Sequence, residues 1–350
     1  MSADGLQAPQ QAEENGASKE KVPYAQRVAQ QLIAQLEAGT APWQRPWNPD
    51  AITFGRPMNP VSNRHYRGIN ALYLLAQGHE DPRWCTYKQA AAEGWQIRRG
   101  EKGTTVEYWQ WEKDEKQADG SKRSVKMDRP KVFWATVFHA SQIDGIPEYV
   151  APERTWDPQE RAEALLQASG AWIEHRPGPD AFYSPASDRI ILPSKELFPS
   201  ADGYYATALH ELGHWSGHPS RLARDMTGTF ASESYAKEEL RAEISSLMVG
   251  TEIGVGHDPG QHASYVKSWI KALKEDPREI FRAAADAEKI FNFVMAFDRQ
   301  HTIENEQKQE QDQERSTGKA QEEQHAPAPV REPIAARRPR SQERQVGMSR

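Results

Sequence analysis

The sequence predicts an α+β protein with two folded parts: a mixed part over residues 22–150, and a mostly helical part with a short β-sheet over residues 151–302. The stretches "TTVEYWQW" (104–111) and "KVFWATVFHA" (131–140) are rich in aromatic and β-branched residues, as strands are. Helix start signals occur in both parts; at Asp157, for example, an acidic N-cap precedes a proline. Strands together with capped helices indicate the α+β class.

An amphipathic helix opens the first part. Gly39 closes it, and its apolar residues recur every four positions, at Val28, Leu32 and Leu36. Short helices are predicted in "GINALYLLAQG" and in "TYKQAAAEG", where Thr86 and Gln89 match a capping box. The charged stretch 112–130 lies between the two predicted strands, and we expect it to form a long hairpin loop.

Helices dominate the second part. The helix that opens at Asp157 is expected to end at Gly170, and "AFYSPASDRIILP" (181–193) predicts two short strands around a turn. Ser200 is the expected N-cap of the next helix, which ends near Gly217. Three further helices are predicted at residues 233–250, 260–274 and 277–300.

Charge and tryptophan are unevenly distributed along the chain. It holds 44 Lys and Arg against 50 Asp and Glu, a net charge of −6. Residues 20–150 hold 18 basic and 15 acidic side chains, whereas residues 151–301 hold 16 and 23. Seven of the eleven tryptophans also lie in the first segment: Trp43, Trp47, Trp84, Trp95, Trp109, Trp111 and Trp134. A mildly basic, tryptophan-rich part beside an acidic part suggests two different functions.

The chain has the composition of a cytoplasmic protein. Cys85 is its only cysteine, so a disulfide or a cysteine-based zinc knuckle within one chain is excluded. The polar residues 1–21 lack the apolar core of a signal peptide, and no apolar run reaches the roughly 20 residues that span a bilayer. Residues 1–21 and 303–350 are too polar to form a folded core, and we expect both to be disordered.

The segment "ALHELGHWSGHPSRLARD" (208–225) contains His210, Glu211 and His214 in the spacing H-E-x-x-H. On a helix, positions four apart lie one above the other, so both imidazoles can reach one ion. Zinc is the expected metal because imidazole suits it, and Glu211 is placed to act as the general base. The alternative is a surface helix whose histidines have no special role. The apolar residues of the segment favour a buried helix instead, on which histidines need partners.

The third ligand must come from elsewhere. Ser220 stands where a metzincin has its third histidine, and His218 comes two residues too early, so we expect His218 to support the ligands. In "YAKEELRAEISSL" (235–247), two glutamates four apart share a helix face. We expect Glu239 to bind the metal and Glu243 to accept the outer N–H of a ligating histidine. Glu238 is the alternative ligand, and a solvated acidic face is the alternative to any site here.

This arrangement predicts peptide hydrolysis. Glu211 would take a proton from water as the metal polarises a carbonyl, and the same carboxyl would protonate the leaving amine. Tyr235 is a candidate oxyanion donor. The strand "DRIILP", just before the motif helix, could present an edge to an extended peptide.

Basic residues alternate with rings in the first part, a pattern that suits single-stranded nucleic acid. Cations follow the backbone, and the rings stack on bases. The candidate DNA-binding residues are Arg64, Tyr66, Arg67, Trp84, Lys88, Arg98, Arg99 and Lys102. Other rings are expected in the core, namely Tyr73, Trp109 and Trp134. Core aromatics with solvated charges remain the alternative for the whole pattern.

Four stretches resemble the ArdC-type antirestriction proteins of plasmids and other mobile elements: "YRGINALYL", "DPRWCTYKQAAAEGWQIRRGEKGTTVEYW", "DRIILPSKELF" and "YYATALHELGHWSGHPSRLARD…YAKEELRAE". The resemblance covers about residues 22–300, in the same order. It implies a single-stranded-DNA-binding domain, a zincin-like metallopeptidase domain and protection of incoming plasmid DNA during conjugation. It places the metal site at His210, Glu211 and His214, with Glu239 matching the family's acidic helix.

Two alternatives to this function stay open. The chain could coat single-stranded DNA and hold a purely structural zinc, or it could be a zinc peptidase whose tryptophan-rich domain binds protein. The same N-terminal module also occurs in plasmid conjugative primases. We do not expect a primase, because the sequence contains no acidic polymerising domain. The identity of any protein substrate does not follow from the motif.

Overall fold

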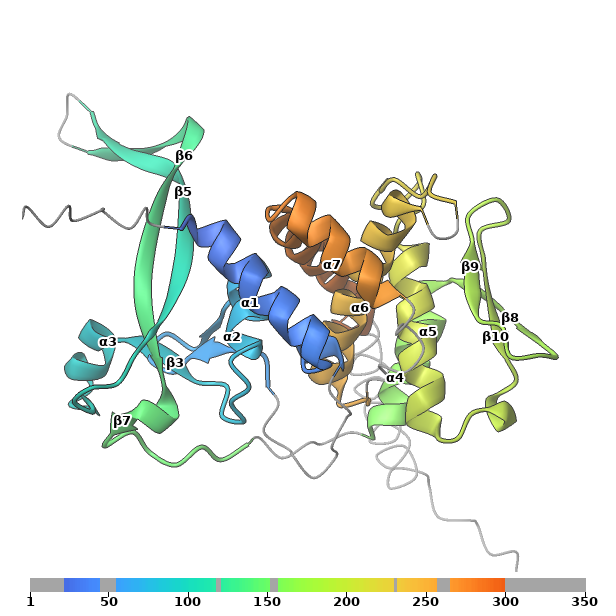
Figure 1. The fold of residues 1–350 in the computed structure, drawn as a ribbon, viewed down its shortest axis with the longest axis horizontal. Coiled ribbons are helices and arrows are strands. Elements are labelled where there is room, and N and C mark those ends of the chain that lie inside the picture. The colour runs from blue at the N-terminus through green and yellow to red at the C-terminus, as the bar shows by residue number, and fades with distance from the viewer. Residues whose placement is uncertain are drawn as a thin grey trace, which may run out of the picture. The chain divides into compact units, whose positions relative to one another are not determined.

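The computed structural model describes residues 22–44, 55–117, 121–151, 157–229, 232–256 and 265–299. Helices and strands are mixed throughout this part of the chain, as the predicted α+β class requires (Figure 1). The expected disorder of residues 1–21 and 303–350 concerns segments outside the described residues. None of the helices in the described ranges combines the length and apolar character needed to cross a bilayer.

The three helices predicted in the first part are present: α1 (Tyr24–Ala38), α2 (Gly68–Leu75) and α3 (Tyr87–Ala92). Gly39 ends α1 in a left-handed conformation with φ of 69°. The capping box of α3 forms as predicted. The backbone N–H of Gln89 donates to Thr86 Oγ1 at 3.3 Å, and that of Thr86 donates to Gln89 Oε1 at 2.9 Å.

The prediction of a loop over the charged stretch 112–130 is wrong for its described residues, 112–117 and 121–130, most of which belong to two paired strands. Strands β5 (Thr104–Lys116) and β6 (Lys122–His139) pair antiparallel along almost their whole length, and β6 also pairs with β3 (Trp84–Thr86) (Figure 1). The backbone supplies the hydrogen bonds of this ribbon, so solvated charged side chains do not prevent pairing. Opposite charges even face each other across it, as at Glu112 and Lys126.

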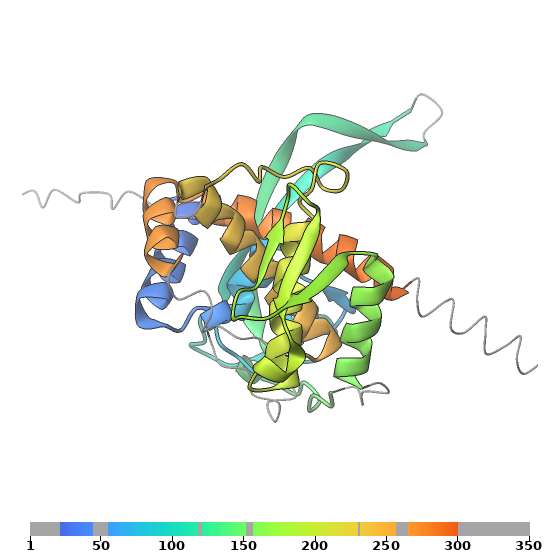
Figure 2. The ribbon, with the colours of Figure 1, turned by 90° about the vertical axis from the view of Figure 1, so that its right-hand side faces the viewer.

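The prediction of core rings on this ribbon is wrong for two tryptophans. Trp109 is 52% exposed and Trp134 is 59% exposed. Tyr73 of α2 is half-buried, and its hydroxyl donates to Gln31 Oε1 at 3.0 Å. Aromatic content therefore identified the strands correctly but not the buried face. Val106 and Val137 point into a core cluster, and Trp109 and Trp134 point to the opposite side of the ribbon, which projects from the helices (Figure 2).

The second part begins with α4 (Pro158–Ser169) and a three-stranded sheet of β8 (Trp172–Arg176), β9 (Phe182–Ser184) and β10 (Arg189–Pro193). Asp157 caps α4, and Gly170 ends it, as predicted. The strand order is β8-β10-β9, with β8 parallel to β10 and β9 antiparallel to it. Strand β8 is an element that we did not predict. Because β10 is central, the expectation that "DRIILP" presents an edge is wrong, and the edge on the β9 side belongs to β9.

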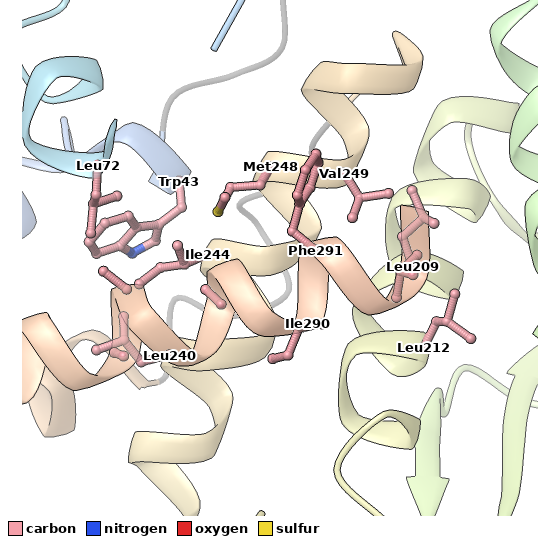
Figure 3. Packing of buried hydrophobic residues seen from close by; sticks show 14 of the residues in the cluster. Trp43, Leu72, Leu209, Leu212, Leu240, Ile244, Met248, Val249, Ile290 and Phe291 are labelled. Carbon is pink, nitrogen blue, oxygen red and sulfur yellow. The ribbon is translucent and has the colours of Figure 1, made fainter. Parts of the chain in front are cut away.

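The remaining helices are α5 (Ala201–Trp215), α6 (Glu233–Ile253), α7 (Val266–Glu275) and one over residues 279–299. They enclose the main hydrophobic core, in which Leu212 of α5 and Ile244 of α6 are fully buried (Figure 3). Trp43 from the first part lies in the same core, and α1 packs against α7. The predicted domains, 22–150 and 151–302, therefore share buried surface, and the boundary between them stays a prediction.

Candidate metal centre

Two helices bring the candidate ligands together. Ser200 caps α5, and its Oγ accepts the N–H of Gly203 at 3.1 Å. Helices α5 and α6 approach closely at Gly213, where an added Cβ would lie 3.0 Å from Ser245 Oγ and 3.4 Å from Ala242 Cα. Small residues at this crossing let the acidic side chains of α6 reach the histidines of α5.

Three donor atoms converge between these helices. Nε2 of His210 lies 3.1 Å from Nε2 of His214. The carboxylate of Glu239 lies 3.4 Å from both nitrogens, through Oε2 for His210 and Oε1 for His214. A tetrahedral ion with ligand bonds of about 2 Å holds its ligand atoms roughly 3.3 Å apart. The observed spacing therefore fits one divalent ion, and all three side chains are buried.

Each imidazole has a carboxylate at its outer nitrogen. Nδ1 of His210 lies 3.2 Å from Glu243 Oε2, and Nδ1 of His214 lies 3.3 Å from Glu238 Oε1. Such contacts fix the tautomer and direct Nε2 toward a metal. Glu238, which was the alternative to Glu239 as a metal ligand, therefore contacts Nδ1 of His214, the nitrogen that faces away from the other donor atoms.

The buried charges of the centre call for a cation. Four carboxylates are nearly inaccessible to solvent: Glu211, Glu238, Glu239 and Glu243. Facing them are two imidazoles and the guanidinium of Arg224. Buried carboxylates are costly without compensating positive charge. Protons on both imidazoles or a divalent ion can supply this positive charge. Because the four carboxylates are buried, the alternative of a solvated acidic face is wrong.

Burial and the neighbouring charges also shift the pKa values of the side chains in the centre. Burial alone would lower the pKa of His210, but the carboxylates of Glu239 and Glu243 outweigh it and raise that pKa to about 9. Burial opposes ionisation of Glu239, yet the two imidazoles hold its pKa well below the usual range. Glu211 differs, because burial raises its pKa. It is therefore the carboxyl of the centre best suited to exchange a proton.

A cleft of about 630 Å³ opens onto the centre, a size typical of ligand sites. His210, Glu211, His214 and Glu239 line it, together with Phe182 and Tyr183 of the edge strand β9. Tyr235 and Tyr265 also line it, with hydroxyl oxygens 3.4 Å apart. Burial, the hydroxyl of Tyr265 and the carboxylate of Glu239 raise the pKa of Tyr235, so its hydroxyl stays protonated and able to donate.

His218 is placed differently. Its Nδ1 lies 2.7 Å from Ser220 Oγ, in the loop after α5. Among the described residues, no contact joins it to the two motif histidines or to Glu239. Its expected supporting role stays a prediction, as does that of Tyr235.

Arg224 is a residue of the site that the sequence did not reveal. Its Nη2 donates to Glu238 Oε1 at 2.6 Å and its Nε to Glu238 Oε2 at 3.1 Å, while Nη2 also reaches the carbonyl oxygen of Gly213 at 2.7 Å. The loop folds back tightly at Gly217, where an added Cβ would lie 2.8 Å from Arg224 Nη2. No periodicity links Arg224 to α6, so only the folded loop shows this contact.

Replacing Arg224 by glutamine is expected to weaken metal binding about 10- to 100-fold, the usual cost of losing an outer partner of a ligand. Without the guanidinium, Glu238 loses its bidentate partner and no longer holds the His214 ring firmly. Competition of the purified protein with a zinc chelator measures the change. Arg221→Gln is the matched control, because Arg221 leaves the same loop but pairs with Asp188. Equal affinities in the two variants would contradict the role of Arg224.

The candidate DNA-binding residues divide into two groups. Tyr66 is 8% exposed and Trp84 is 2% exposed, and the Tyr66 hydroxyl donates to the Trp84 carbonyl oxygen at 3.0 Å. Both rings belong to a core cluster with Val106 and Val137, so a base could not stack on them without disrupting that core. The cations are all exposed, namely Arg64, Arg67, Lys88, Arg98, Arg99 and Lys102.

Family models match both parts of the chain. Residues 23–138 match the N-terminal domain of anti-restriction factor ArdC, and residues 160–286 match a zincin-like metallopeptidase. A solved metal-free structure of the antirestriction ArdC protein from plasmid R388 is 36% identical, with a TM-score of 0.64, and the match covers 80% of this chain and 99% of that one. A Mn(II)-bound structure of that protein matches with the same identity and TM-score over 79% and 98%.

Curated relatives match over similar lengths of this chain. The protein y4eC of Sinorhizobium fredii is 37% identical over 284 residues, which are 77% of this chain and 91% of y4eC. Two proteins of Escherichia coli named DNA primase TraC are 58% and 56% identical over 297 residues, or 81% of this chain. The matched region spans only 28% and 20% of those two proteins. With both domain models in order and a solved homologue matched over nearly its full length, the chain belongs to the ArdC family of antirestriction proteins.

Proposed function

We propose that this chain is a single-stranded-DNA-binding antirestriction protein with a zinc metallopeptidase domain, and that it protects incoming DNA during conjugation. The observation that carries the enzymatic half is the convergence of two imidazole nitrogens and a carboxylate beside the buried Glu211, in the lining of a cleft. The zincin-like domain and the Mn(II)-bound relative support a divalent ion at this site. Two imidazoles with one carboxylate favour zinc.

The proposed ligands are His210, His214 and Glu239. When bound, the ion supplies Lewis acidity toward a substrate carbonyl. Glu211 takes a proton from the attacking water and returns it to the leaving amine, a role that its raised pKa suits. The protonated hydroxyl of Tyr235 donates to the oxygen on which negative charge develops.

The substrate of this activity is proposed to be an extended peptide. The edge strand β9 lines the cleft through Phe182 and Tyr183, and a peptide can add to such an edge through main-chain hydrogen bonds. This placement replaces the edge that we expected from β10. Glu211 lies close to the same strand, with a hydrogen bond to the Tyr183 backbone.

The DNA-binding half of the proposal is tested with the full chain and oligo-dT. We expect binding that weakens steeply between 50 and 200 mM salt, because cations released from phosphates dominate such affinity. A duplex of equal length is the control and should bind more weakly. Binding that is absent, or insensitive to salt, would favour the alternative in which the tryptophan-rich part binds protein.

A further inference from the structure

Three exposed tryptophans lie on one face of the ribbon formed by β5 and β6. Trp134 pairs with Glu107, and Trp109 pairs with Val132. Because paired residues and alternate residues of a strand share a face, Trp109 and Trp134 point to the same side. Trp111 lies at a register shift between Gln110 and Glu112, and the stacking of its ring on Trp109 places it on that side as well. Trp109, Trp111 and Trp134 are 52%, 47% and 59% exposed, and the rings of Trp109 and Trp111 stack with centroids 6.2 Å apart. We call these three residues the tryptophan face.

The same side of the ribbon continues into a surface hollow. Beyond Trp134, its residues on β6 are Thr136 and Phe138. Phe138 lines an open hollow of about 500 Å³ together with Tyr87, whose side chain is 54% exposed. Trp134 and Phe138 are four residues apart, or about 13 Å along the strand. Rings at both ends therefore define a continuous path along one side of β6.

Basic side chains lie close to this path. Arg98 and Arg99 line the hollow, and Lys88 and Lys102 are exposed close to it in sequence. Two acidic residues of the hollow, Glu101 and Asp144, engage Arg98 at 2.9 and 3.5 Å. Residues 104–139, which include both strands, hold seven basic and six acidic side chains, a net charge of +1 in a chain of net charge −6.

The chemistry of this surface suits bases better than an apolar partner. Polar side chains lie among these rings: Glu107 stands opposite Trp134, and the exposed Thr136 follows it on the same side of β6. Flat rings spaced along a groove with cations nearby are the usual means of holding single strands, because every base offers a π-face. Exposing three tryptophans also has a cost in water, which a binding function offsets.

We propose that single-stranded DNA lies along this side of the ribbon, with bases stacked on the tryptophan face and the strand continuing toward the hollow of Tyr87 and Phe138. The proposal rests on the proposed single-strand binding and places it on the molecule. It replaces Tyr66 and Trp84 as stacking rings, since both are buried. Arg99 and Lys102 contact phosphates at the hollow end.

The test is a titration of fluorescent oligo-dT with the full chain carrying Trp109→Ala and Trp134→Ala together. Each lost stack weakens binding about 5- to 150-fold, so the double variant should bind roughly 25-fold more weakly or worse. Its salt dependence should match the wild type, because no charge is removed. Arg99→Ala should instead weaken binding and lower the salt slope by about one.

Trp172→Ala is the matched control, since Trp172 is an equally exposed tryptophan (59%) on β8. It should bind as the wild type does, and Trp109→Phe with Trp134→Phe should restore most of the lost affinity. Circular dichroism and thermal unfolding verify that the alanine variant is folded. A folded double variant with wild-type affinity overturns this location. Failure of the wild type to bind oligo-dT overturns the proposed function itself, so the two failures are distinguishable.

Discussion

Substitution of Glu239 by alanine is expected to weaken metal binding by more than about a hundredfold. This exceeds the usual cost of losing a residue that only hydrogen-bonds to a ligand, because the substitution removes a ligand itself. The carboxylate lies 3.4 Å from Nε2 of both histidines. Among the described residues, Glu239 is the one that completes a group of three possible metal ligands with His210 and His214. Equilibrium dialysis against Zn²⁺ followed by elemental analysis measures the stoichiometry. One tightly held equivalent is expected in the wild type.

Two further variants of α6 provide the comparison for Glu239→Ala. Glu252→Ala removes an exposed glutamate from the same helix and should retain full metal binding. Glu243→Ala should retain the ligands and lose about 10- to 100-fold in affinity, because it removes only the outer partner of His210. If Glu239→Ala still holds one equivalent of zinc at wild-type affinity, the ligand assignment is wrong.

Replacement of Glu211 by glutamine is expected to lower hydrolysis about 10²- to 10⁴-fold, the usual contribution of a general acid–base group. The amide keeps the size of the side chain but cannot accept and return a proton. Metal content should be unchanged, since Glu211 is not one of the three converging residues. Cleavage of a quenched fluorescent casein, with zinc content measured on the same sample, separates the two effects.

The same variant decides whether the centre matters for plasmid protection. If hydrolysis is part of the function, Glu211→Gln reduces transfer of a plasmid into a restricting recipient while oligo-dT binding survives. Glu233→Gln is the control, because this glutamate lies exposed at the start of α6. Unaltered protection by Glu211→Gln would leave the centre with a structural role, and the chain as a DNA-coating protein.

Local signals in the sequence located most helices but misjudged the ribbon. Capping at Thr86, Asp157 and Ser200 depends on contacts within a few residues, so these helix starts were predictable. The charged distal halves of β5 and β6 were not. They pair residues only 6 to 14 positions apart, from Lys116 with Lys122 to Glu112 with Lys126, but their charged side chains show no alternation of apolar and polar residues that would indicate a strand.

The family and the motif helix were predictable from residue identities alone, because both depend on residues at fixed spacing: His210 and His214 share a helix face wherever that helix lies. Tertiary structure decided the rest of the centre. The packing of α5 on α6 through Gly213 selected Glu239 for the inner position and Glu238 for the outer one, and the loop after α5 added Arg224. The tertiary structure also decided that Trp84 is buried and Trp134 is exposed. Burial depends on which surfaces of the fold pack together, and the residues next to a tryptophan in the sequence do not specify this.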